Sequence, residues 1–315
     1  MEDLTPRYRA RIHIGPDVDE HSKPGWIAVY DKQNGRQLVK VAADPLYFGP
    51  DDQVPPRSGQ RVAYREQSLI IHADFNFDGR KDLALQDGRN GCHGNTTYQV
   101  YLATATGFAH SQPFTDLAEC EMFTVDARQQ RLRTQRSWGS GYNQEEYAVR
   151  DNRPFLVSRY TDDHAQVPFL TETQQTWNGR RLVTTVRREV LLGEEDKICT
   201  FQLAESKRRV VIFALDSTML YYALLRPDDS IEFCYPAPEA ENAPPFTLHH
   251  SAAGLSLRFQ NGSARYEIRE TPDGRLAVTA QIGAKTRTMD SAAQGKSGRL
   301  RPLLTMELAN LTLQP

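Results

Sequence analysis

The chain has 315 residues, with 38 basic and 40 acidic side chains and a formal net charge of −2. This length allows two compact domains, and the balanced charge argues against nucleic acid and against an anionic membrane surface as partners. The sequence contains no apolar run long enough to cross a membrane as a helix.

The first residues, Met1 to Pro6, are polar and lack the apolar region of a signal peptide. They predict a cytoplasmic protein, although a periplasmic protein whose signal peptide has been removed would begin in the same way. None of the four cysteines forms a C-x-x-C pair, which argues against zinc and thioredoxin-like chemistry. Pairing within each half predicts the disulfides Cys92–Cys120 and Cys199–Cys234, and buried thiols are the alternative.

Most of the chain consists of short apolar or alternating runs, which are typical of β-strands. Asn34-Gly35, Asn178-Gly179 and Asn261-Gly262 lie between such runs and predict hairpins, and Asp273-Gly274 predicts a further turn. We therefore predict an all-β fold with a barrel or sandwich in each half.

Several irregular elements interrupt these strands. One short helix is expected from Thr115 to Cys120, with Thr115 as its N-cap. Loops are expected over 43–65 and 236–245, and a strand at 303–308 is expected to close the fold.

An acidic break at Gly193–Asp196 suggests where one domain ends. On this basis we divide the chain into residues 1–193 and residues 194–315. The first part contains the patterns that indicate a function. The second part is a further β domain whose role the sequence does not indicate.

The stretch from Asp74 to Asp82 places oxygen-bearing side chains at its first, third, fifth and ninth positions. A curled loop turns alternate side chains toward one point, and Gly79 at the sixth position permits the bend. Ca²⁺ takes roughly six to eight oxygen ligands. The spacing predicts a calcium loop between two strands, and an Asx-rich turn without metal is the alternative. The predicted ligands are Asp74, Asn76, Asp78, Asp82 and the backbone carbonyl of Arg80.

Two later loops combine glycines, small polar residues and aromatic rings. The first covers 87–98, and the second covers 137–143. Rigid aromatic side chains on polar loops are typical of binding surfaces. The alternative is that Tyr98 and Trp138 are core residues and that the glycines only form turns. The candidate partner-binding residues are His93, Tyr98, Trp138 and Tyr142.

The sequence shows no pattern for catalysis. It lacks an H-E-x-x-H motif, a G-x-S-x-G elbow and a phosphate-binding loop. Glu145 and Glu146 suggest a glycosidase, but adjacent strand residues point to opposite faces, so they cannot form the facing carboxylates that hydrolysis needs. We expect them to be solvated charges on a strand, and we expect the protein not to be an enzyme.

Four stretches in the first part carry a further pattern: Asp74–Gly79 with Asp82–Ala84, Tyr98–Leu102, Phe123–Asp126 and Ser137–Tyr147. Together they resemble a family of bacterial periplasmic lysozyme inhibitors, over roughly residues 24–190. This family includes immunity lipoproteins that protect bacteria from secreted peptidoglycan hydrolases, as in a toxin–antitoxin pair delivered by a secretion system. It is related to inhibitors of invertebrate-type lysozyme.

The resemblance implies a β-rich, calcium-binding inhibitor of the periplasm that plugs the cleft of a peptidoglycan hydrolase or lysozyme-like effector with a loop. It also leaves room for a lipid anchor outside this sequence. Relatives often read Gly-Gly-Pro-Ser-Tyr where this chain has Gly94–Tyr98, and Cys92 and His93 also depart from the pattern. We therefore expect a different target enzyme. A calcium-dependent glycan-binding or cell-envelope module is the alternative function.

Overall fold

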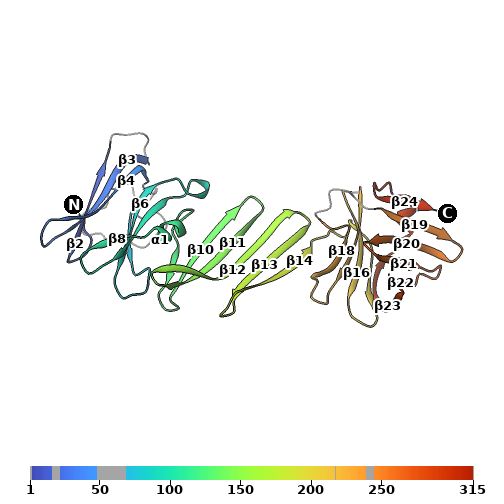
Figure 1. Cartoon of the computed structure of the whole chain (residues 1–315). Helices are drawn as coiled ribbons and strands as arrows, with labels where there is room; N and C mark the ends of the chain where they lie inside the picture. Colours follow the sequence, from blue (N-terminus) through green and yellow to red (C-terminus); the bar gives the residue numbers. More distant parts are fainter. Residues whose placement is uncertain (1, 16–21, 48–68, 217, 239–244, 315) are drawn as a thin grey trace. The chain divides into compact units, whose positions relative to one another are not determined.

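A computed structural model describes residues 2–15, 22–47, 69–216, 218–238 and 245–314. These residues form four β-sheets and one short α-helix (Figure 1), which confirms the predicted all-β class. No helix in this described part is long and apolar enough to cross a membrane. The chain divides into two compact units: Met1–Thr161 with Gln174–Thr185, and Asp162–Thr173 with Val186–Pro315.

The first unit begins with a sheet of four antiparallel strands in chain order: β1 (Glu2–Asp3), β2 (Tyr8–Ile14), β3 (Ser22–Asp31) and β4 (Gln37–Tyr47). The predicted hairpin at Asn34-Gly35 is confirmed, and Gly35 has the positive φ of 72° that its turn requires. β4 occupies the start of the loop predicted over 43–65. The remainder of that loop, from residue 48 on, lies outside the described residues.

A second four-stranded sheet follows, with β5 (Ile70–Ala73), β6 (Asp82–Gly88), β7 (Thr97–Ala103) and β8 (Phe108–His110) in order. The predicted strands on either side of the Asp74–Asp82 loop are therefore present. β6 is buried on both faces, because Leu83 and Leu85 pack with the first sheet while Ala84 packs with the helix on the other side. This central position anchors the Asp74–Asp82 loop to two cores.

The single α-helix, α1 (Gln112–Leu117), begins earlier than predicted. Its N-cap residue is Ser111, not Thr115, and Pro113 lies in its first turn. Proline suits that position because its missing N–H has no partner inside the helix there. Phe114 and Leu117 fix the helix by packing into the core.

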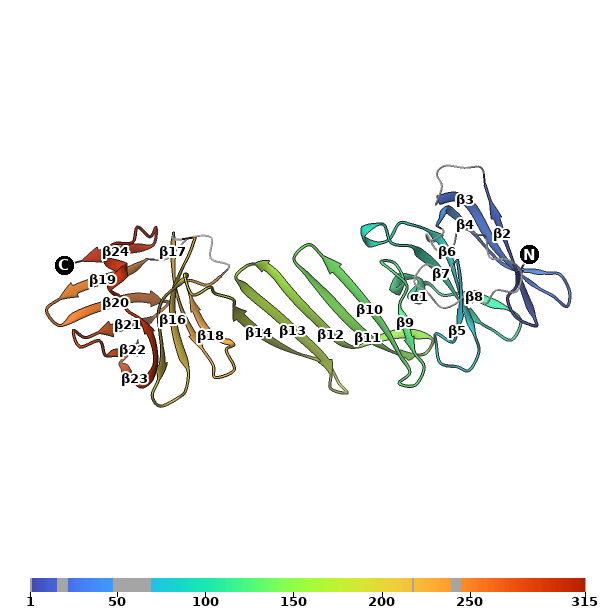
Figure 2. The same ribbon diagram turned by 180° about the vertical axis from the view of Figure 1, so that it is seen from behind.

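The third sheet is a meander in which consecutive strands are neighbours, running from β14 to β9 (Figure 2). Its strands are β9 (Thr124–Asp126), β10 (Arg131–Trp138), β11 (Gly141–Arg150), β12 (Arg153–Gln166), β13 (Phe169–Trp177) and β14 (Leu182–Val190). The hairpin predicted at Asn178-Gly179 joins β13 to β14. No residue of β12 is fully buried, so both faces of this strand keep partial contact with water.

The second unit contains a ten-stranded sheet ordered β18-β17-β16-β15-β23-β22-β21-β20-β19-β24. Its strands are β15 (Lys197–Leu203), β16 (Arg209–Leu215), β17 (Met219–Leu225), β18 (Ile231–Tyr235), β19 (Phe246–Ser251), β20 (Gly254–Asn261), β21 (Ala264–Glu270), β22 (Leu276–Ile282), β23 (Lys285–Gly298) and β24 (Leu311–Gln314). The turns predicted at Asn261-Gly262 and Asp273-Gly274 are confirmed.

The end of the chain differs from the prediction. Residues Arg301–Leu304 form a 3-10 helix with Pro302 in its first turn, where a strand was expected over 303–308. The last strand is β24, which pairs in parallel with β19. Local sequence does not specify this pairing, because its partner lies far away in the chain. The loop predicted over 236–245 lies outside the described residues from 239 to 244.

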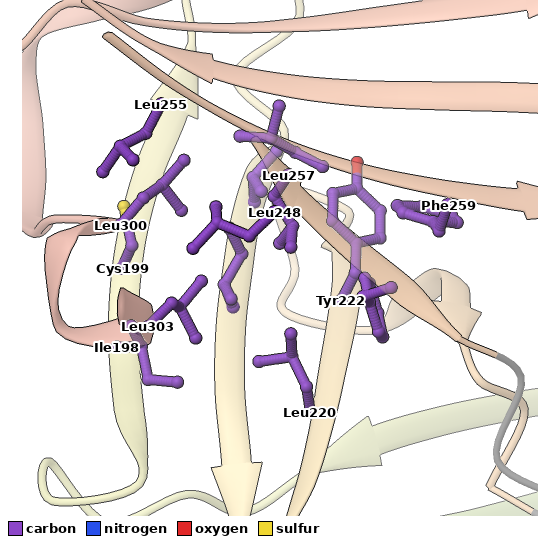
Figure 3. Packing of buried hydrophobic residues seen from close by; sticks show 14 of the residues in the cluster. Ile198, Cys199, Leu220, Tyr222, Leu248, Leu255, Leu257, Phe259, Leu300 and Leu303 are labelled. Atoms are coloured by element: carbon purple, nitrogen blue, oxygen red, sulfur yellow. The ribbon is translucent and has the colours of Figure 1, made fainter. Parts of the chain in front are cut away.

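The curled sheet of the second unit encloses a large apolar core (Figure 3). Leu248, Leu257 and Leu300 are almost completely buried there. Aromatic rings fill one end: Phe259 stacks on Tyr235 with ring centroids 4.3 Å apart and on Tyr266 at 4.8 Å. Burial of this apolar surface stabilises the unit without a disulfide.

The predicted bridge Cys199–Cys234 is wrong, because both residues are thiols in this structure. Cys199 lies in the enclosed core on β15, whereas Cys234 packs against the outer face of the sheet on β18. Two strands separate them, which places them roughly 14 Å apart, too far for a bridge. The first predicted bridge, Cys92–Cys120, is confirmed.

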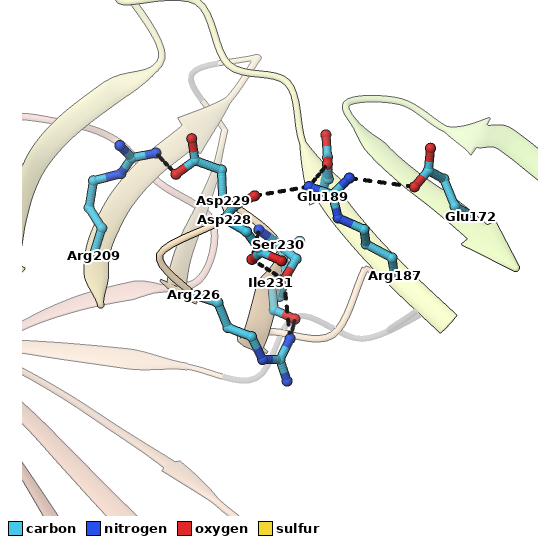
Figure 4. A network of polar contacts seen from close by, with 9 residues as sticks. All are labelled: Glu172, Arg187, Glu189, Arg209, Arg226, Asp228, Asp229, Ser230 and Ile231. Carbon is cyan, nitrogen blue, oxygen red and sulfur yellow. Dashed lines mark hydrogen bonds and ion pairs between the residues drawn. The ribbon is translucent and has the colours of Figure 1, made fainter. Parts of the chain in front are cut away.

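A polar network holds a turn of the second unit against β13 and β14 (Figure 4). Arg187 on β14 lies 3.6 Å from the Glu172 carboxylate and donates to the backbone carbonyl of Asp228 at 2.9 Å. Glu189, on the same strand, is 2.5 Å from the guanidinium. The Ser230 hydroxyl closes the turn by donating to Asp228 at 2.7 Å.

Candidate functional site

The Asp74–Asp82 loop is closed by hydrogen bonds from its own backbone. Asp74 accepts from the N–H of Asp78 at 3.1 Å and from the N–H of Gly79 at 2.8 Å. Asp78 in turn accepts from the N–H of Arg80 at 2.8 Å. Gly79 has φ 87°, which supports the role predicted for it at the bend. Asp74, Asp78 and the amide of Asn76 therefore lie close together, with Asp78 exposed and Asn76 buried.

Asp82 has a different environment from the other loop carboxylates. It is completely buried, and one oxygen accepts from the N–H of Phe75 at 2.7 Å while the other accepts from the N–H of Ala103 at 2.8 Å. Burial raises the pKa of Asp82 to about 6, although these backbone hydrogen bonds oppose the change. Asp82 thus joins the loop to the end of β7.

The donor types of this loop suit a hard cation, because carboxylate and amide oxygens are the ligands that Ca²⁺ prefers. A carboxylate oxygen that accepts one hydrogen bond also keeps a second lone pair. The loop does not draw its carboxylates into one tight cluster: in the part of the chain that is described, no three Asp, Glu, His or Cys side chains are grouped as metal ligands. Calcium binding by this loop is therefore a proposal.

The first predicted binding loop, residues 87–98, is called the glycine-rich loop, and the disulfide between Cys92 and Cys120 holds it. Residues Cys92–Gly94 form a 3-10 turn in which His93 has φ 56° and Gly94 has φ 75°. A Cβ on Gly91 would lie 2.4 Å from the backbone oxygen of Cys120, so only glycine fits beside the bridge. This loop is fixed at its base and presents an exposed His93 at its tip.

Tyr98 is not available to a partner. It is 1% exposed and belongs to the core beneath α1. Burial raises the pKa of its hydroxyl to about 12, although side-chain hydrogen bonds with Thr96 and Gln86 oppose the change. The alternative that the sequence left open, a core tyrosine at the end of the loop, is therefore what the structure has, because β7 alternates and turns Tyr98 inward.

The second predicted binding loop, residues 137–143, lies next to the first, residues 87–98. Trp138 and Gly141 face each other at the end of the β10–β11 hairpin, and Trp138 is 38% exposed. The Nε2 atom of His93 lies 2.7 Å from the backbone oxygen of Ser137. Of the four predicted binding residues, the structure brings His93 and Trp138 to the same end of β10, and Tyr142 follows on β11.

A crevice of about 250 Å³ separates the two loops. Its walls include the disulfide, His93, Asn95 and Arg136. Two exposed residues that line it, His93 and Asn95, and the exposed Trp138 that follows Ser137 on β10 are here called the two-loop surface. It offers an imidazole, an amide and an indole on a backbone that is fixed from both sides.

A buried carboxylate on β11 was missed by the sequence interpretation. Glu145 is 4% exposed, so the prediction that it is a solvated charge is wrong. Arg159 donates to it at 2.6 Å and the Tyr147 hydroxyl donates at 2.6 Å. Burial alone would raise the pKa of Glu145, but these hydrogen bonds and the positive charge of Arg159 hold it below its ordinary value. Its neighbour Glu146 pairs with Arg133 on the opposite face.

No protein-family model matches the chain, and no curated protein sequence matches it. Among solved structures, the chain is similar to a Xanthomonas type IV secretion system related protein, with 18% identity and a TM-score of 0.43 over 57% of this chain and 90% of that chain. It is also similar to the Dos1 propeller, with 13% identity and a TM-score of 0.22 over 89% of this chain and 66% of that chain. Both scores are too low to establish a shared fold.

Proposed function

We propose that the first unit inhibits a peptidoglycan hydrolase or lysozyme-like effector by placing the two-loop surface in the cleft of that enzyme, as an immunity protein does. The observation that carries this proposal is the contact between His93 and Ser137, which joins two loops of the predicted binding surface. The Cys92–Cys120 disulfide fixes the same loop from the other side.

This arrangement suits an inhibitor because a rigid surface loses little conformational entropy on binding. Trp138 supplies an exposed indole, the side chain that most often dominates the energy of an interface. Calcium bound by the Asp74–Asp82 loop would further stiffen the base of the glycine-rich loop, which follows it through β6. The proposal includes a periplasmic location, with which a disulfide is compatible because disulfides persist in oxidising compartments.

The experiment measures lysis of peptidoglycan by a panel of purified hydrolases, including an invertebrate-type lysozyme, with and without the whole chain. Inhibition of at least one enzyme at equimolar concentration is the expected result. Trp138→Ala should weaken that inhibition roughly 30-fold, equivalent to about 2 kcal/mol. Trp26→Ala is the matched control, because Trp26 lies on the first sheet. Equal loss in both variants, or no inhibition of any enzyme, would contradict the proposal.

A further inference from the structure

A second cavity, of about 520 Å³, opens on one face of strands β10 to β13 in the first unit. Gln135 on β10 and Gln144 on β11 are directly opposite each other and share this face. Ser158 and Tyr160 on β12, and Gln174 on β13, continue the row. We call this cavity the glutamine groove. Four strands at the usual spacing give it a length of roughly 14 Å.

The groove carries little free positive charge. Arg133 lies 2.7 Å from Glu146 and 3.2 Å from Asp126, so its positive charge is neutralised on both sides. The side chain of Glu145 points to the opposite face of the sheet, where Arg159 engages it at 2.6 Å. Because two carboxylates neutralise Arg133 and the remaining charged residue of the lining, Glu121, is acidic, the groove offers no strong attraction to an anion.

Three neutral polar side chains of the groove are available to a ligand. Within the described part of the chain, the side chains of Gln135, Gln144 and Ser158 have no hydrogen-bond partner. Each glutamine amide offers two donors and an acceptor, and the serine hydroxyl offers both functions. A ligand that carries many hydroxyl or amide groups would match this set without any charge.

Tyr160 adds an aromatic wall to this polar row. Its ring lies beside that of Tyr142, with the centroids 5.9 Å apart and the planes tilted by 53°. Tyrosine presents an apolar ring together with a polar tip. A sugar ring is complementary to it, because one face of the sugar carries C–H groups and its rim carries hydroxyls.

We propose that the glutamine groove binds a neutral oligosaccharide, laid across the strands with a sugar ring against Tyr160 and with hydroxyl groups bonded to Gln135, Gln144 and Ser158. The cavity volume lies within the range of small-molecule sites, roughly 300–1,000 Å³. This binding activity does not depend on the proposed inhibition, since it needs neither the two-loop surface nor a hydrolase.

The test titrates chitotetraose, cellotetraose and maltotetraose separately into the whole chain, with calorimetry for affinity and saturation-transfer NMR for contact. At least one of the three should bind. Gln135→Ala and Gln144→Ala should each weaken that binding about 5-fold, as expected for one hydrogen bond, and the double variant should lose most of it. Both glutamines are exposed, so the melting temperature should stay at the wild-type value.

Gln281→Ala is the control, because Gln281 is an exposed glutamine on β22 in the other unit. Its oligosaccharide affinity should equal that of the wild type. Heparin serves as an anionic competitor and should not displace the oligosaccharide. No binding of any of the three sugars, unchanged affinity in the double variant, or displacement by heparin would each overturn the proposal. None of these outcomes bears on hydrolase inhibition, which is measured separately.

Discussion

His93 and Ser137 lie 44 residues apart in the sequence, and a 2.7 Å hydrogen bond joins the imidazole of one to the backbone carbonyl of the other. Because a carbonyl oxygen only accepts, the imidazole must carry its proton on Nε2. This bond connects the disulfide-braced loop to the end of β10. The His93 side chain therefore links the two loops of the two-loop surface, in addition to the disulfide that fixes the first loop.

Replacing His93 should loosen that surface without unfolding the protein. His93 has φ 56°, a conformation that asparagine tolerates better than alanine does, so His93→Asn removes the ring with little backbone strain. We expect a loss of about 1 kcal/mol in the free energy of unfolding and faster hydrogen exchange at the β10–β11 turn. Unchanged exchange at that turn would show that the bond does not restrain the hairpin.

Tyr98→Ala should act on stability and not on binding. Removal of this buried ring leaves a cavity in the core beneath α1, at a cost of roughly 3–5 kcal/mol in the free energy of unfolding. Tyr98→Phe keeps the ring and should cost much less. Denaturant unfolding compares the two variants. A large loss of target affinity in folded Tyr98→Phe would contradict the assignment of Tyr98 to the core.

Reduction should destabilise the first unit through one bridge only. The Cys92–Cys120 disulfide closes a loop with a sequence separation of 28, and its loss should cost roughly 3 kcal/mol. The paired variant with serine at both positions should melt at the same temperature with and without a reductant, whereas the wild type should not.

Burial raises the pKa of the Cys199 thiol to about 12, so iodoacetamide should modify Cys199 only after unfolding.

Glu145 should give the first unit an acid-sensitive contribution to its stability. The pKa of Glu145 is lowered in the folded chain, so this contribution is fully present above the pKa of the unfolded state, about 4.3. It is lost as the pH falls through the lower folded value. Melting curves between about pH 6 and pH 3 should fall more steeply for the wild type than for Glu145→Gln.

Glu146→Gln is the control for that experiment. Glu146 pairs with Arg133, and the side chains of both residues are well exposed. Exposed ion pairs contribute little to stability, so this variant should follow the wild-type curve. Identical pH dependence in all three proteins would show that the buried ion pair with Arg159 does not contribute.

The sequence alone was sufficient to predict those features of the fold that local chemistry decides. Asn34-Gly35 and Asn178-Gly179 require turns whatever surrounds them, and Gly79 marks the bend of the Asp74–Asp82 loop. The sequence prediction started α1 at the wrong residue, because Ser111 and Thr115 are both acceptable N-caps. Only the packing of Phe114 and Leu117 chooses between them.

The sequence alone was not sufficient to predict features that depend on strand register or on residues far away in the chain. Tyr98 belongs to the loop pattern by sequence, but the pleat of β7 turns it into the core. Glu145 is buried because Arg159 reaches it from the next strand, and a shift of one residue in register would have exposed it. The separation of Cys199 from Cys234 follows from the order of strands in the sheet, which cysteine spacing does not encode.

The two kinds of carboxylate in the Asp74–Asp82 loop provide a test for calcium. Asp78 is exposed, and its oxygens contact the N–H of Arg80 and the amide of Asn76. Asp82 is buried and accepts three backbone N–H groups, those of Phe75, Asn76 and Ala103. If the loop binds Ca²⁺, the Asp78 carboxylate should stabilise the protein mainly when the metal is bound. The Asp82 carboxylate should stabilise it both with and without the metal.

We therefore expect the wild-type melting temperature to rise on addition of calcium chloride and to fall again with a chelator. Asp78→Ala should abolish most of that shift while costing less than about 1 kcal/mol in chelator. Asp82→Ala should destabilise the protein in both conditions, because it leaves buried N–H groups without an acceptor. Asp116→Ala, an exposed acid on α1, is the control and should keep the full shift. A wild-type melting temperature that is the same with calcium and with chelator would show that the loop is an Asx-rich turn held by its own hydrogen bonds.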